Sequence, residues 1–301
     1  MKKIIVSVLA FALMLSLCAG LSVSAFAEDS AAPVAENLEL KTYQNVSVGG
    51  MLSAYDADGS TLEYTITTQP VKGDIELETD GSFVYTPREN KKGRDYFGYK
   101  AQDAEGNVSQ EATVIIKIEK AKKDVLYSDM RGHADEYAAV ALAEHDVFTG
   151  EQLGGKYCFN PDKLVTRGEF VSLCMLTAGE SAVEAVMSTG YADDADIPMW
   201  MKGYVTAAAM RGVVENGAYG AAFAADSPIT QTEAALMLDK ALNLTSVSYI
   251  PLDDTLAPAA AQACANLTAC GVMEQTADPG YLTRGTMAEL LTGAMDLLEN
   301  R

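Results

Sequence analysis

The sequence is poor in histidine and in basic residues. It has only two histidines, His133 and His145, and 22 Lys and Arg against 42 Asp and Glu, a formal net charge of −20. So few histidines limit the acid–base and metal chemistry open to the chain. So large an acidic excess should repel nucleic acid over most of the surface, and no nucleic-acid partner is expected. An anionic ligand would need a few locally placed cations.

Long apolar runs are equally scarce. Residues 4–17 form one, which is short for a membrane span, and no other long uncharged stretch follows. Lys2 and Lys3 precede this run, and small residues at positions 25 and 27 suit a cut after Ala27. This order predicts a secretory signal peptide over residues 1–27 and no membrane segment after cleavage. A cut before Cys18 is disfavoured because bulky Leu17 precedes it.

Cysteine gives no clear crosslinking pattern. Once the leader is removed, Cys158, Cys174, Cys264 and Cys270 remain. An exported chain can pair its cysteines. However, positions 264 and 270 lie on an expected helix, about 240° apart around its axis, so they do not face each other. We therefore expect free, buried thiols.

The chain from about residue 37 to residue 118 has the alternating pattern of strands. Turn signals such as Asp58-Gly59 and Asp80-Gly81 separate the runs. Short strands at this spacing, with no helical period between them, predict an all-β sandwich over residues 28–120. The alternating apolar positions are Leu62, Tyr64, Ile66, Ile75, Leu77, Phe83, Tyr85, Phe97, Tyr99, Ala101, Val114, Ile116 and Ile118.

Four stretches of this region, residues 56–64, 80–87, 95–99 and 103–106, resemble bacterial cadherin-like or immunoglobulin-like repeats. The resemblance implies an Ig/cadherin-like sandwich but no particular function, because such domains serve as spacers, adhesins and enzyme appendages alike.

Three aspartates of the same region, Asp56, Asp58 and Asp103, could offer oxygens to calcium. Asp and Gly are also common turn formers, and we favour that interpretation. No cofactor or metal site is predicted.

The pattern changes after the charged boundary at residues 119–124. A period of about sixty residues appears, which is typical of a repeat architecture. Three units result, over about 124–180, 188–244 and 248–300. Each opens near an aspartate and later carries a threonine segment; these residues are Asp129, Asp193 and Asp253, then Thr166, Thr230 and Thr283. We expect the helical part, residues 121–301, to fold independently of the sandwich.

The threonines mark the starts of helices. Thr166 and Thr230 stand three residues before Glu169 and Glu233, the spacing of a capping box. Thr283 lacks that glutamate. Apolar residues at helical spacing follow each threonine, and an earlier helix precedes it in every unit. One such unit cannot bury its apolar face alone, so the three should pack together. When the three units are aligned, Cys174 falls at an apolar position of its helix, which predicts a core residue.

This pattern resembles the S-layer homology family over about residues 124–298. The signature features are an initial aspartate, a tryptophan opening the first helix, a Gly-Ile-like turn and a Thr-Arg-Ala-Glu-like segment. Residues 166–169, Thr-Arg-Gly-Glu, match the last feature best. The resemblance implies an all-α bundle of three repeats that binds secondary cell-wall polymer, often pyruvylated, in grooves between repeats.

By the same resemblance, Arg167 and Arg284 are expected to contact acidic sugars of the polymer. A guanidinium offers a planar fork to a carboxylate, and a helix N-terminus favours an anion. The second unit has Gln231 in place of the arginine, and the third has Thr286 in place of the glutamate. We expect Arg167 to be the main contact because its unit keeps both signature residues. Further contacts are carried over to Asp129, Asp193, Asp253 and Trp200.

The sequence thus predicts a non-catalytic surface protein, anchored to the cell wall or S-layer of a bacterium through a peptidoglycan-linked secondary polysaccharide. One alternative is a wall-polysaccharide hydrolase, although no carboxylate pair for glycoside cleavage stands in a recognisable motif. A second alternative is that the repeats form a protein–protein or lattice interface with other surface proteins.

Overall fold

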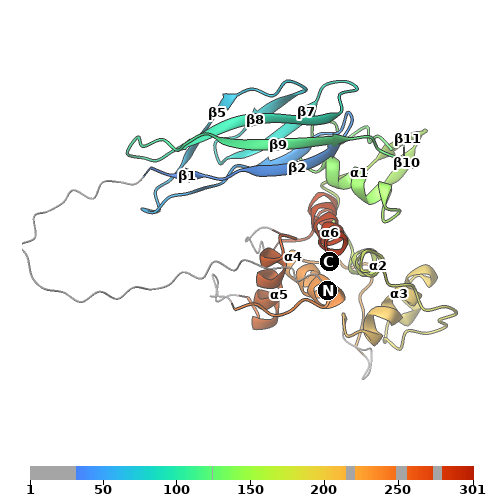
Figure 1. Cartoon of the computed structure of the whole chain (residues 1–301). Helices are drawn as coiled ribbons and strands as arrows, with labels where there is room; N and C mark the ends of the chain where they lie inside the picture. Colours follow the sequence, from blue (N-terminus) through green and yellow to red (C-terminus); the bar gives the residue numbers. More distant parts are fainter. Residues whose placement is uncertain (1–31, 124, 215–220, 249–255, 274–279) are drawn as a thin grey trace, which may run out of the picture.

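The computed structural model describes residues 32–123, 125–214, 221–248, 256–273 and 280–301. The predicted signal peptide and Asp253 lie outside these residues. Strands occupy the N-terminal part and helices most of the remainder (Figure 1). None of the described helices is long and apolar enough to span a membrane.

The N-terminal strands form two sheets. One has the strand order β2-β9-β8-β5 and the other β3-β7-β6, while β1 and β4 pair as a short ribbon. Strand β2 runs parallel to β9, and the other pairs are antiparallel. The bounds are β1 Val34–Ala35, β2 Leu38–Tyr43, β3 Val48–Met51, β4 Ala54–Tyr55, β5 Glu63–Thr68, β6 Gly73–Leu77, β7 Ser82–Pro87, β8 Gly93–Gln102 and β9 Ala112–Glu119.

The two sheets share one apolar core. Phe83 of β7 meets Phe97 of β8 edge-on, with the ring centroids 5.3 Å apart. Tyr85 and Tyr99 are fully buried beside them. The Tyr85 hydroxyl donates to Asp95, at 2.8 Å, which satisfies a polar group that would otherwise be costly to bury. The alternation seen in the sequence therefore marks the inner faces of the two sheets.

The helices exchange partners between units. The first helix of each unit packs against the capped helix of another unit: α1 on α6, α3 on α2 and α5 on α4. No unit therefore buries its apolar faces by itself. The bounds are α1 Glu136–Glu144, α2 Arg167–Thr177, α3 Met199–Met210, α4 Gln231–Leu242, α5 Pro258–Ala269 and α6 Arg284–Glu299, with a short 3-10 turn, η1, at Asp194–Asp196.

The first helices end in the same way. Asp146, Gly212 and Gly271 occupy the matching turn positions and all have positive φ, 60°, 72° and 71°. The left-handed conformation explains the two glycines, and aspartate tolerates it better than most residues. The loop of the first unit forms a hairpin, β10 Glu151–Leu153 with β11 Lys156–Cys158, which the sequence analysis missed.

The sandwich contacts the helical part directly. Val46 belongs to the helical core, and the rings of Tyr43 and Tyr137 lie 5.6 Å apart. Buried Glu136 accepts a hydrogen bond from the Ser47 backbone N–H at 2.9 Å. Figure 1 shows β2 and β9 running above α1 and α6. The boundary predicted at residues 119–124 is therefore a change of pattern in sequence rather than a break in packing.

The cysteines are free, as predicted. Cys174 is fully buried in the helical core, as its alignment indicated. The other three thiols are less buried than expected: Cys158 and Cys264 are partly buried, and Cys270 is exposed because it caps the C-terminal end of α5.

Candidate functional site

Each capped helix begins at its predicted threonine. The hydroxyls of Thr166, Thr230 and Thr283 accept a hydrogen bond from the backbone N–H three residues on, at 3.2–3.3 Å. In turn, the carboxylates of Glu169 and Glu233 accept a hydrogen bond from the backbone N–H of their threonines at 3.0 Å, so two capping boxes are complete. The third helix start has only the threonine half.

The residues just before these caps form a closed ring. The N–H of Val165 donates to Leu282 O, that of Leu282 to Ile229 O, and that of Ile229 to Val165 O, at 2.8–3.0 Å. All three side chains are buried. The ring places the three helix starts around one axis, so the first helical residue of one unit lies near the third of the next. We call the resulting contacts junctions 1/2, 2/3 and 3/1, after the units they join.

An ion pair closes junction 1/2. Arg167 Nη2 lies 2.6 Å from Glu233 Oε1, while Glu233 Oε2 completes the capping box. Burial opposes ionisation of Glu233, but the hydrogen bonds from Thr230 and the charge of Arg167 hold its pKa below the ordinary value. The residue expected to be the main ligand contact thus joins two units.

Arg284 at junction 3/1 has different partners. Its buried guanidinium donates from Nη1 to Phe159 O, at 3.1 Å, and from Nη2 it pairs with Glu151 at 3.1 Å. The Phe148 ring lies 5.2 Å from its Cζ atom, within the range of a cation–π contact. Lys163 also contacts Glu151, and together the two cations lower the pKa of this carboxyl.

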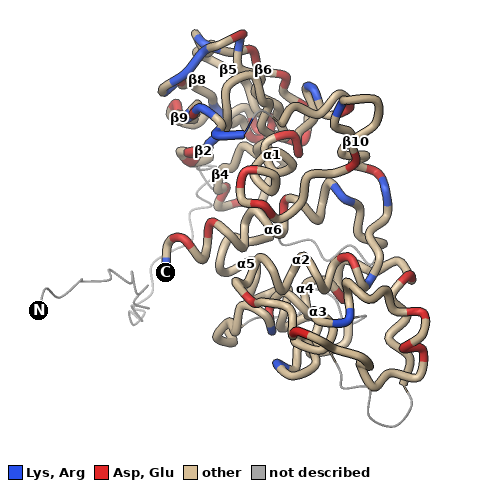
Figure 2. Tube along the Cα trace, turned by 90° about the vertical axis from the view of Figure 1, so that its right-hand side faces the viewer, with Lys and Arg blue, Asp and Glu red and all other residues tan. Residues whose placement is uncertain are grey.

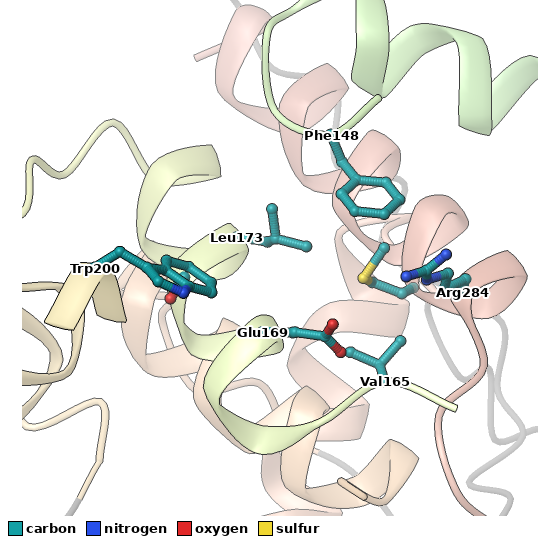
Figure 3. A pocket seen from close by; sticks show the side chains of 8 residues that line it. Phe148, Val165, Glu169, Leu173, Trp200 and Arg284 are labelled. Atoms are coloured by element: carbon teal, nitrogen blue, oxygen red, sulfur yellow. The ribbon is translucent and has the colours of Figure 1, made fainter. Parts of the chain in front are cut away.

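A cavity of about 330 Å³ opens at junction 3/1. Arg284 and Phe148 line one side, and Trp200, reaching in from α3 of the second unit, lines the other (Figure 3). Trp200 is 60% exposed, so it is not part of the core. Glu169 and Leu173 lie between them. An exposed indole face beside a few polar groups suits a sugar, which has both apolar and hydroxyl-bearing faces.

The signature aspartates hold loops. Asp129 accepts the backbone N–H groups of Phe159 and Asn160 at 3.0 and 2.7 Å. Asp193 does the same for Phe223 and Ala224, both at 2.7 Å. Asp129 therefore fixes the backbone whose carbonyl receives Arg284. These contacts give both aspartates a structural role, and the ligand contact expected by resemblance stays a prediction.

The calcium candidates also make turn contacts. Asp103 accepts hydrogen bonds from the backbone of Glu105 and Asn107 at 2.9 and 2.8 Å, and Asp56 accepts one from Ser60 at 2.8 Å. Oδ1 of Asp56 is buried with no hydrogen-bond partner, and Asp58 is exposed. In the part of the chain that the structure describes, no three metal-ligating side chains come together.

The sequence analysis missed two residues at junction 3/1: Phe148, which lines the cavity, and Glu151, which pairs with Arg284. The turn Gly154-Gly155 was the available signal, because a Gly-Gly pair is typical of a two-residue hairpin turn. Both have positive φ, 57° and 81°. That hairpin carries Glu151 to Arg284.

Comparisons with known proteins divide the chain near the boundary that the sequence analysis predicted at residues 119–124. The model of the bacterial cadherin-like domain matches residues 30–120, and that of the S-layer homology domain matches residues 126–171, within the first unit. No curated protein matches the chain.

Similar solved structures include an endo-fucoidan hydrolase of glycoside hydrolase family 107, 19% identical over 32% of this chain, with a TM-score of 0.26. The chain spans 14% of that protein's length. An SrpA adhesin from Streptococcus sanguinis is 18% identical over 34% of this chain and 68% of its own, with a TM-score of 0.25. Drosophila N-cadherin is 14% identical over 30% of this chain and 25% of its own, with a TM-score of 0.24. TM-scores this low support no inference.

The family matches support a coarse assignment of function. A cadherin-like domain suits a surface protein, and S-layer homology domains generally bind cell-wall polymers. Residues 30–120 are therefore similar to a bacterial cadherin-like domain and residues 126–171 to an S-layer homology domain, a kind of domain that associates proteins with the bacterial cell surface.

Proposed function

We propose that this is a non-catalytic surface protein, exported by its leader and held to the wall by three S-layer homology repeats. The cyclic exchange of helices and the ring through Val165, Ile229 and Leu282 support extending the repeat assignment to the second and third units. The ligand is an anionic secondary cell-wall polysaccharide, with pyruvylated sugars as one source of the charge. It binds in the cavity at junction 3/1.

The observation that carries this proposal is the pairing of Arg284 with Trp200 across one cavity. Acidic residues are spread over the chain, and helices α3 to α5 carry few cations (Figure 2). A cation inside a cavity can attract an anionic ligand despite the repulsion from the acidic surface, because the surrounding protein screens its charge less than bulk water does.

Binding uses groups already in place. The sugar ring packs on the indole of Trp200, and its carboxylate approaches the guanidinium of Arg284. That group has five N–H donors, and its contacts with Phe159 and Glu151 use two of them. A charge-assisted hydrogen bond contributes about 1.5–3 kcal/mol, or roughly ten- to a hundredfold in affinity. Because Asp129 and Glu151 fix the arginine beforehand, little side-chain entropy is lost on binding.

Pelleting with purified wall tests the proposal. The mature chain should pellet with intact wall and lose most of that binding once the secondary polymer is extracted. Equal binding before and after extraction would favour a protein–protein or lattice interface instead. A turnover assay on the same wall addresses the enzyme alternative, and release of sugar fragments would contradict the non-catalytic assignment.

A further inference from the structure

Junction 2/3 contains a second cavity, of about 490 Å³, which is the counterpart of the one at junction 3/1. It lies between the start of α4, the first turns of α6 and the turn after α5. The two cavities correspond position by position. Gln231 stands where the first has Arg284, Thr286 where it has Glu169, Glu289 where it has Ser172, Leu290 where it has Leu173, and Met273 where it has Phe148.

The two cavities differ in charge. None of the described residues lining the 2/3 cavity is a lysine or an arginine. Uncharged Gln231 and Thr286 stand where the other cavity has Arg284 and Glu169, and exposed Glu289 adds a carboxylate. In a chain with a formal net charge of −20, a cavity without a cation repels an acidic sugar.

The polar groups present suit an uncharged ligand. A glutamine amide and a threonine hydroxyl each donate and accept hydrogen bonds, as do sugar hydroxyl and acetamido groups. Val272, Met273 and Leu290 supply an apolar wall for a sugar face or an acetyl methyl group. The volume lies within the range of small-molecule sites.

We propose that junction 2/3 is a second binding site, specific for an uncharged N-acetylated sugar residue. This inference rests on the proposed function only in that the helical units bind glycan. The wall is then recognised at two sites, with an acidic sugar bound at junction 3/1 and an uncharged sugar bound at junction 2/3. Binding at both raises the overall affinity without any new contact, because the second event is intramolecular.

The test compares two probes on the mature chain by calorimetry: an N-acetylglucosamine tetrasaccharide and a pyruvylated disaccharide. Gln231→Ala combined with Thr286→Val removes the polar groups of the 2/3 cavity and retains side-chain bulk at position 286. This variant should weaken binding of the uncharged probe by about tenfold or more and leave the acidic probe unchanged. Trp200→Ala, at the other cavity, is the matched control and should have the opposite effect. Thermal melts confirm that both variants fold.

The outcomes separate this inference from the proposed function. If the acidic probe fails to bind while the uncharged probe depends on Gln231 and Thr286, the 2/3 site stands and the function proposed for junction 3/1 falls. If the uncharged probe does not bind, or is lost in Trp200→Ala instead, the 2/3 site is overturned.

The source of the sugar is assigned by pelleting the Gln231→Ala/Thr286→Val protein. Loss of binding to polymer-extracted wall assigns the sugar to peptidoglycan, and loss confined to released polymer assigns it to the polymer. Either result supports the site, and unchanged binding to both contradicts it.

Discussion

Arg167 and Arg284 occupy the same position at the starts of related helices, but they make different contacts. Arg167 reaches Glu233 of the next unit and closes junction 1/2. Arg284 has Glu169 nearby in its cavity, yet its guanidinium contacts Glu151 and the carbonyl of Phe159. The hairpin present in the first unit supplies Glu151. A signature position therefore does not fix a residue's role, because the loops that reach it decide which partners it has.

The largest expected difference between the two arginines is in stability. Arg284→Gln should lower the free energy of unfolding by about 2–3 kcal/mol, because it leaves the buried carbonyl of Phe159 without its charged donor and Glu151 with Lys163 as its remaining cation. Arg167→Gln should cost about 0.5–1 kcal/mol, since both partners are partly exposed. Urea melts of the two variants measure this. Equal losses, or a larger loss for Arg167, would contradict the contrast.

The caps provide a smaller test of the same comparison. Thr166→Ala and Thr230→Ala should each cost about 1 kcal/mol, since each breaks a complete capping box. Thr283→Ala should cost less, about 0.5 kcal/mol, because no glutamate returns the bond there. If Thr283 proves the most costly of the three, the third helix start depends on contacts other than its cap.

The pH dependence of junction 1/2 is the smallest effect. Because the pKa of Glu233 is held below its ordinary value, its contribution to stability is complete above the ordinary glutamate range. That contribution is lost as the pH falls through the lowered value. The stability gap between wild type and Arg167→Gln should therefore close on acidification from about pH 7 to pH 3. A gap that stays constant in melts across this range would mean that the ion pair adds nothing.

Glu136, between the sandwich and α1, should show the opposite slope. Burial outweighs its hydrogen bonds from Ser47 and Gly132 and raises its pKa. Its ionisation therefore opposes folding above the ordinary glutamate range, and its contribution improves as the pH falls through the raised value. Subtracting Glu136→Gln melts from those of wild type isolates this slope; a stability difference that falls on acidification would contradict the sign.

The sequence predicted the features that depend on local pattern. Strand alternation, the threonine caps and the repeat register come from residues within a few positions of one another. The partners of the arginines do not: Arg167 and Glu233 belong to different units, and Phe159 reaches Arg284 from the far end of the helical part. Long-range backbone hydrogen bonds, among them the ring at Val165, Ile229 and Leu282, determine which helix start meets which. The contact of Val46 with the helical core could not be predicted either, because its partners lie far away in the sequence. Independent folding of residues 121–301 stays a prediction.

The central claim is that ligand binds at junction 3/1 and not at junction 1/2. Its most direct test is wall binding by Trp200→Ala and Arg167→Gln, each shown by a thermal melt to be folded. Trp200 is exposed, so its loss should spare stability yet weaken binding by about tenfold or more. Arg167→Gln should bind like wild type despite its slightly lower stability. If instead Arg167→Gln loses binding and Trp200→Ala keeps it, the polymer binds at junction 1/2 and the assignment is wrong.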